Sequence, residues 1–209
     1  EKFSSSHGHG VFLDEALDRL PADVWRWVLL AQAPETADTW FSWDLVAEIA
    51  NKDLSGQLGN LVHRLLPLLV AGGGRVPAGA GAAEHAVWGE VAEVLGRLRA
   101  AHEAIALRAG IGALRDLFHV ANRYVDARAP WRLAGDERDD VLRTCCELLR
   151  TVAVAIRPVL PHTSDTIGRV VGLDEAELRG SLASVAGPGG LVGRPITAVP
   201  PLFPRIELG

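Results

Sequence analysis

The chain has 209 residues, of which 48% are hydrophobic and 22% are charged, a composition that excludes a disordered tail, a collagen-like chain and a disulfide-framed peptide. Its formal net charge is −5, so no basic field over the whole chain favours nucleic-acid binding. Of its 21 basic residues only Lys2 and Lys52 are lysines, so any contact with nucleic acid is expected to be local and made by arginine.

Helical periodicity recurs along the chain and alternating strand patterns are almost absent. The sequence therefore predicts an all-α fold, a bundle of four or five principal helices. Two short helices are expected over 13–20 and 22–32, with Pro21 at the start of the second. Ser42 is expected to cap a long helix that the three glycines at 72–74 end. The apolar stripe of that helix comprises Leu45, Ile49, Leu58, Leu61, Val62, Leu65 and Leu69.

A second long helix is expected after a Gly/Ala/Pro-rich connection over 72–83, with an apolar stripe from Val87 to Ile105. Gly110 and Gly112 are expected to separate it from a third helix. Pro130 is expected to end the third helix, and Asp136–Asp140 to start a fourth, which Pro158 and Pro161 end. Short helices are expected over 164–171 and 174–182. The stretch 187–209 is expected to lie extended against the body.

The cysteines and the lengths of the apolar runs indicate the cellular compartment of the protein. Cys145 and Cys146 are adjacent and point about 100° apart on a helix, so they are expected to be small apolar core residues in a reducing compartment. No apolar run approaches the roughly 20 residues that span a bilayer, so we expect a cytoplasmic protein that makes no membrane contact. No signal peptide is visible. The chain contains no methionine, even at residue 1, which favours a piece of a longer protein.

The opening stretch, Glu1–Gly10, carries the densest functional chemistry. Lys2 stands beside the hydroxyls of Ser4, Ser5 and Ser6 and close to two glycines, and such a loop can wrap an oligophosphate. The alternative is a disordered terminus with a stray lysine. His7 and His9 have no carboxylate or thiol nearby, so no metal site is expected there.

A second group of candidates has the chemistry to bind unpaired bases. Asn60 and Arg64 are four residues apart and therefore share one helix face, where an amide and a guanidinium can read base edges. Trp131 can provide a stacking platform. The alternatives are an Asn60 bonded within a helix junction, an Arg64 paired with a carboxylate and a Trp131 packed in the core. The other tryptophans expected to act as packing anchors are Trp25, Trp27, Trp40 and Trp43.

The same residues carry a resemblance to a known family. The stretch Lys2-Phe3-Ser4-Ser5-Ser6 resembles the Lys-Met-Ser-Lys-Ser signature loop of class I aminoacyl-tRNA synthetases, and the residues after this loop resemble methionyl-tRNA synthetases over nearly the whole chain. The matching segments are Pro21–Arg26, Leu29-Leu30, Phe41-Ser42-Trp43, Asn51, Leu54, Leu58-Gly59-Asn60-Leu61 with Arg64, Ala121-Asn122-Arg123-Tyr124, Ala129-Pro130-Trp131, Arg157–Thr163 and Pro201–Glu207.

The resemblance implies three parts: a signature loop and connecting helices (1–40), an anticodon-binding helical bundle (41–182) and an extended tail (183–209). It implies that Asn60, Arg64 and Trp131 read the CAU anticodon. It also implies that Lys2, Ser4, Ser5 and Ser6 form a nucleotide-binding loop, with Lys2 and Ser5 at catalytic positions. ATP with Mg²⁺ would be bound mainly by a nucleotide-binding half that these residues do not include, and no cofactor is expected on this segment alone.

Two departures from the family pattern matter. Ser5 stands where the family has its second signature lysine, and His7 stands where an arginine often follows the loop. Losing such an ammonium beside the ATP phosphates costs about 3–4 kcal/mol of transition-state stabilisation. The nucleotide-binding sheet is also missing from these residues, so the expected partners are an N-terminal catalytic half and an amino-acid substrate, with tRNA as a further candidate.

Three functions remain open on the sequence alone. The first, slightly preferred, is a tRNA-independent ligase of specialised metabolism, such as a hydrazine-forming synthetase joined to a cupin, because the loop is altered and the chain is acidic. The second is a housekeeping methionyl-tRNA synthetase, which Asn60, Arg64 and Trp131 favour. The third is a free-standing, non-catalytic tRNA-binding module. An upstream catalytic half would exclude the third, and an attached cupin would support the first.

Overall fold

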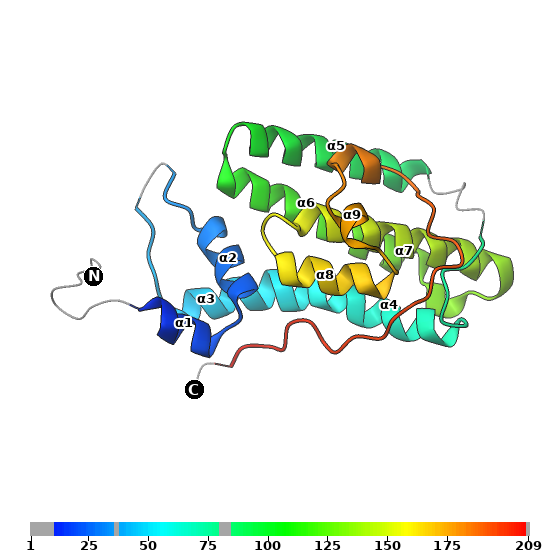
Figure 1. Cartoon of the computed structure of the whole chain (residues 1–209), viewed down its shortest axis with the longest axis horizontal. Helices are drawn as coiled ribbons and strands as arrows, with labels where there is room; N and C mark the ends of the chain where they lie inside the picture. Colours follow the sequence, from blue (N-terminus) through cyan, green and yellow to red (C-terminus); the bar gives the residue numbers. More distant parts are fainter. Residues whose placement is uncertain (1–10, 36–37, 80–84, 208–209) are drawn as a thin grey trace.

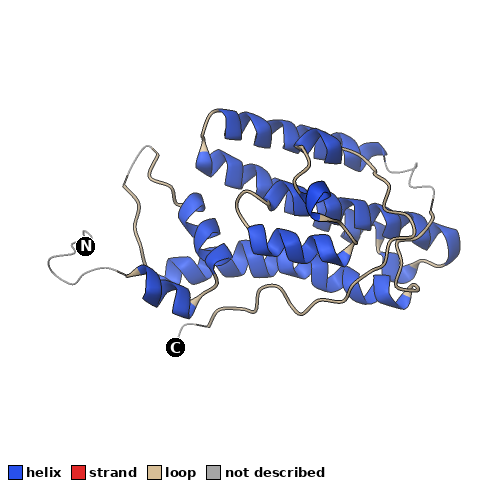
Figure 2. Cartoon of the chain, in the orientation of Figure 1, coloured by secondary structure: helices blue, strands red, loops and turns tan. Residues whose placement is uncertain are grey.

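The computed structural model describes residues 11–35, 38–79 and 85–207, and over these residues the chain folds into helices and loops without a β-sheet (Figure 2). This confirms the predicted all-α fold. The elements in chain order are α1 (Leu13–Arg19), α2 (Ala22–Ala31), α3 (Trp43–Ile49), the π-helix η2 (Ala50–Gly59), α4 (Asn60–Ala71), α5 (His85–Glu103), α6 (Leu107–Arg128), the 3₁₀ turn η4 (Pro130–Arg132), α7 (Gly135–Ile156), α8 (Pro161–Val170), α9 (Glu175–Leu178) and the 3₁₀ turn η5 (Leu182–Val185).

The long helix predicted after Ser42 exists, but its middle ten residues are π-helical. The Ser42 hydroxyl accepts a hydrogen bond from the Leu45 N–H at 3.1 Å, which confirms the cap. Gly72 follows the last turn, as expected. The π-helix (η2) between α3 and α4 was not predicted, because its residues continue the same apolar stripe. Of that stripe only Leu45 is incompletely buried.

Helices α5 and α6 form an antiparallel pair (Figure 1), and the boundary between them differs from the prediction. Ile105 lies in the connecting turn with a φ of +54° and is 77% exposed, so it is not part of the α5 stripe. Gly110 and Gly112 lie inside α6. The reason is a tertiary contact: the Glu35 carboxylate, from the loop after α2, accepts the Leu107 N–H at 2.5 Å and starts α6 before the glycines.

Helix α7 lies in the centre of the molecule and contacts α4, α6 and α8. From Val141 to Ile156 every residue except Arg143 and Arg150 is buried, as expected of a helix enclosed on several sides. Cys145 and Cys146 are both buried here, which confirms them as core residues. Burial, with a smaller contribution from the charge of Glu147, raises the pKa of the Cys146 thiol to about 12.

The C-terminal tail runs extended along the body toward α1 (Figure 1), as predicted. It begins beside residue 76, where the Val76 N–H donates to the Arg194 carbonyl at 2.9 Å. It ends at a two-bond clamp: the Asn51 amide donates to the Ile206 carbonyl at 2.9 Å and accepts the Ile206 N–H at 2.8 Å. The tail therefore joins the two ends of the long helical run.

The predicted tryptophan anchors are confirmed in three cases and wrong in one. Trp25 and Trp27 are buried, and Trp43 packs edge-on against Trp25 at 5.5 Å between ring centroids. Trp40 is 80% exposed. The packing position beside Trp25 is filled instead by Phe41, which leaves Trp40 outside. None of the helices in the described ranges is both long enough and apolar enough to span a membrane.

Candidate nucleic-acid interface

Asn60 and Arg64 occupy the first turns of α4, on the same helix face. The π-helix (η2) leads directly into this turn, since the Asn60 N–H donates to the carbonyls of Gln57 and Ser55. Asn60 is half-buried, and its side-chain amide has no hydrogen-bond partner within the described part of the chain. Its donors and acceptor are therefore available to a ligand.

Arg64 is held in place from two sides. Its guanidinium forms an ion pair with Asp126 of α6, at 2.5 Å between Nη2 and Oδ1. The same guanidinium carbon lies 5.1 Å from the centroid of the Trp131 ring, a cation–π arrangement. The alternative interpretation of Arg64 as a paired residue is thus also correct, and the pairing orients it toward Trp131.

Trp131 lies on a short hydrogen-bonded turn and is half-exposed to solvent. Ala129 ends α6 with φ +42° and ψ +60°, and Pro130 begins the 3₁₀ turn η4 and is buried. The Arg132 N–H closes the turn on the Ala129 carbonyl at 2.8 Å. Trp131 is 48% exposed, so it is not the core residue that the alternative predicted. An exposed indole backed by a guanidinium suits stacking with an unpaired base.

Polar residues of α6 fix the helix that carries Asn60. The Asn122 amide donates to the Gln57 carbonyl at 3.2 Å and to the Phe118 carbonyl at 3.0 Å. The buried Asp53 of η2 accepts hydrogen bonds from Trp27 Nε1 at 2.9 Å and from Arg115 Nε at 2.8 Å. These contacts position α4 against α6, and therefore Arg64 against Trp131.

Of the three residues that the sequence indicated, Asn60, Arg64 and Trp131, the structure brings Arg64 and Trp131 together. Asp126, the carboxylate partner of Arg64, was not predicted. The feature of the sequence that could have indicated it is its position five residues before Trp131. The expected phosphate loop of Lys2, Ser4, Ser5 and Ser6 lies outside the described residues. Among the residues that are described, no three histidine, cysteine or acidic side chains gather into a group that could hold a metal.

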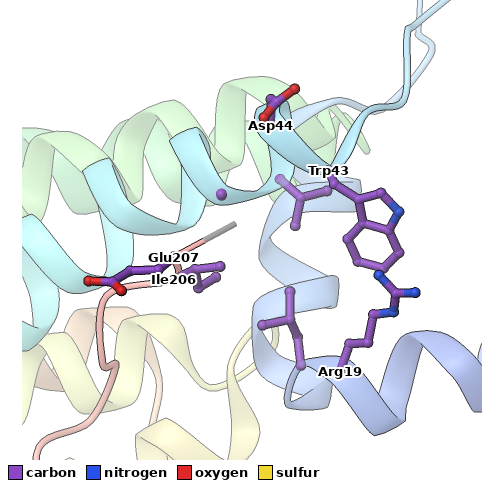
Figure 3. A pocket seen from close by; sticks show the side chains of 8 residues that line it. Arg19, Trp43, Asp44, Ile206 and Glu207 are labelled. Atoms are coloured by element: carbon purple, nitrogen blue, oxygen red, sulfur yellow. The ribbon is translucent and has the colours of Figure 1, made fainter. Parts of the chain in front are cut away.

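A separate open pocket of about 390 Å³ lies where α1, the start of α3 and the end of the tail meet (Figure 3). Arg19 stacks over the Trp43 ring at 4.4 Å and also pairs with Glu15 at 2.9 Å. Asp44 and Glu207 bring two further carboxylates to the pocket. With its one guanidinium already paired, this pocket is poorly suited to phosphate, and the Arg64–Trp131 surface is the better candidate for nucleic acid.

Comparison with known proteins identifies two family models in this chain. The model described as tRNA synthetases class I (M) matches residues 1–66. The model described as the anticodon binding domain of methionyl tRNA ligase matches residues 76–207.

Individual relatives of the chain indicate the same family as the two family models. The chain is 39% identical to a methionine–tRNA ligase of Caulobacter vibrioides, over 99% of this chain and 37% of that protein. It is 35% identical to methionine–tRNA ligase 1 of Acaryochloris marina, over 99% of this chain and 38% of that protein. The Mycobacterium tuberculosis methionyl-tRNA synthetase in complex with methionyl-adenylate matches with a TM-score of 0.84 and 26% identity, over 97% of this chain and 41% of that one. The chain thus spans about two fifths of the length of these relatives.

Proposed function

The chain belongs to the methionyl-tRNA synthetase family, and from this premise we propose that it is the C-terminal part of a methionine–tRNA ligase, with a helical bundle that binds the tRNA anticodon. The observation that carries the proposal is the half-exposed Trp131 indole with the Arg64 guanidinium held against it by Asp126. Stacking takes any base, so the neighbouring Asn60 amide and Arg64 would supply the base-edge hydrogen bonds that select the sequence.

Each of the three parts of the chain has its own role in such a ligase. Residues 1–40 are the signature loop and connecting helices, 41–182 the anticodon-binding bundle and 183–209 a tail that straps the bundle. A catalytic half would precede them, as the length of the relatives suggests, and would bind ATP, Mg²⁺ and the amino acid. Lys2 and Ser5, with the hydroxyls of Ser4 and Ser6, would approach the phosphates as the aminoacyl-adenylate forms and pyrophosphate leaves.

Two observations support the tRNA-dependent version over the tRNA-independent ligase that the sequence slightly favoured. The Caulobacter, Acaryochloris and Mycobacterium relatives are named as methionine–tRNA ligases or methionyl-tRNA synthetases, and these names give no support to a hydrazine-forming enzyme. Trp131 is also placed outside the core, where a base can reach it. The tRNA-independent version stays as the second candidate because Ser5 and His7 depart from the signature and the net charge is −5.

The test is to titrate initiator tRNA into the full-length protein and into its Trp131→Ala variant. Losing the stacking platform should weaken binding by about 1–3 kcal/mol, roughly 5- to 150-fold. Trp40→Ala is the matched control, because Trp40 is the more exposed tryptophan and contributes nothing to the Arg64–Trp131 surface.

Equal affinities of wild type and Trp131→Ala would contradict the proposed interface. A Trp131→Ala variant that melts several degrees lower would instead make Trp131 a structural residue. Undetectable tRNA binding beside intact ATP-dependent amino-acid activation would favour the tRNA-independent ligase.

A further inference from the structure

Most arginines near the interface already have a carboxylate partner. Arg64 pairs with Asp126, Arg123 with Glu90 and Arg115 with Asp53. The charge that each brings is therefore largely offset within the protein. In an acidic chain, a strand of RNA approaching Trp131 would meet little unbalanced positive charge from these side chains.

Arg132 differs from them. It follows Trp131 directly in the 3₁₀ turn η4 and is exposed. Within the described residues its guanidinium has no ion pair and no hydrogen bond. The exposed acidic residues that begin α7, Asp136 and Glu137, stand four and five positions further along the chain and form no ion pair with it. Arg132 is thus a free guanidinium beside the proposed stacking platform.

The geometry of the turn separates the two side chains. Successive residues of a 3₁₀ helix point about 120° apart, so Arg132 diverges from the Trp131 ring and does not cover its open face. A nucleotide has the same division, with a flat base on one side and a charged phosphate on another. Guanidinium groups pair with phosphate through two parallel hydrogen bonds, and the arginine stem is long enough to adapt to the position of the phosphate.

Resting on the proposed function, we infer that Arg132 contacts a phosphate of the RNA strand whose base stacks on Trp131. Phosphate contacts position a nucleic acid without reading its sequence, whereas Asn60 and Arg64 would read the base edges. Arg132 would therefore raise affinity for every tRNA alike and would leave the choice of anticodon unchanged.

The experiment measures tRNA affinity of the full-length protein between about 50 and 200 mM salt, with an initiator tRNA and with the same tRNA carrying an altered anticodon. Arg132→Gln should lower the slope of log Kd against log salt by about 0.7, the value for one phosphate of a single strand. It should weaken both tRNAs by the same factor, several-fold at the lowest salt. Arg132→Lys keeps the charge and should keep the slope.

Arg99→Gln is the matched control, because it also removes one exposed arginine, on α5, whose nearest carboxylate is 3.8 Å away. Its slope should equal that of the wild type. The inference would be overturned by an unchanged slope for Arg132→Gln, or by a loss of affinity confined to the tRNA with the correct anticodon. In either case the proposed function would still stand if wild-type tRNA binding depended on Trp131. A wild-type protein that binds no tRNA would overturn both.

Discussion

Single carboxylates decide much of the internal geometry, and Asp53 is the clearest case. It is buried in η2, and one of its oxygens accepts hydrogen bonds from Trp27 of α2 and from Arg115 of α6. A buried charge is tolerated only when it is paired and hydrogen-bonded. Asp53 therefore ties three elements together at the segment that leads into Asn60.

Asp53→Ala should destabilise the fold by about 2–3 kcal/mol, measured from urea unfolding midpoints. This is less than the ~3–5 kcal/mol typical of a fully buried broken pair, because the Arg115 side chain is 36% exposed and can be hydrated. The control is Asp116→Ala, whose pair with Arg97 is largely exposed and should be worth less than ~1 kcal/mol. Equal losses in the two variants would contradict this role for Asp53.

At the scale of elements, the tail is held by an ion pair as well as by the Asn51 clamp. Arg194 donates to both oxygens of Glu177, each at 2.7 Å, and to the Gly172 carbonyl at 3.0 Å. These side-chain hydrogen bonds lower the pKa of Glu177, against a smaller opposing effect of burial, and the same pair raises the pKa of Arg194. The tail is thus attached to α9 through a carboxylate that prefers to stay ionised.

The lowered pKa of Glu177 predicts how stability depends on pH. The stabilisation is complete above the ordinary value of 4.5 and is lost as the pH falls through the lower value of the folded state. Since both side chains are about one third exposed, the loss should stay below ~1 kcal/mol. Urea unfolding at pH 7 and pH 3 should show a smaller acid loss in Glu177→Gln than in the wild type.

Glu175→Gln is the control for this pH dependence. Glu175 lies on the same helix but pairs with Arg179 in a largely exposed contact, so its replacement should leave the acid loss near that of the wild type. If Glu177→Gln lost as much stability on acidification as the wild type does, the tail would not depend on this pair.

At the scale of the whole molecule, the connecting helices share one core with the bundle. Trp27 of α2 stacks on Phe118 of α6 at 5.5 Å between centroids. The Asp23 carboxylate accepts both the N–H and the hydroxyl of Thr163, each at 2.7 Å, at the start of α8. The first two of the three proposed parts are therefore divisions of function within one packed unit.

This sharing predicts a single unfolding transition. Three of the six tryptophans lie in α2 and α3, so fluorescence is weighted toward these helices, whereas far-UV circular dichroism reports on all helices. Both signals should give the same urea midpoint. A fluorescence transition at clearly lower urea would mean that the connecting helices unfold separately. Phe118→Leu should lower both midpoints together, because it removes aromatic contacts between the two parts.

The amino-acid sequence by itself determined which segments are helical and where several of them begin and end. Ser42 caps α3, Pro21 precedes the first turn of α2 and Gly72 ends α4, because caps, prolines and glycines act on the backbone within one turn. The periodic apolar stripe fixed the buried face for the same local reason. Asn60, Arg64 and Trp131 were likewise recognised as candidates from residue chemistry, spacing and resemblance.

Only the tertiary structure decided how these pieces meet. Glu35, about seventy residues away in sequence, starts α6 before its glycines, and Phe41 leaves Trp40 in solvent. The stacking of Arg64 on Trp131 and its pairing with Asp126 join residues more than sixty positions apart. Such contacts depend on where whole helices pack, a choice made by the summed burial of many side chains, so the local periodicity and caps that set each helix cannot specify them.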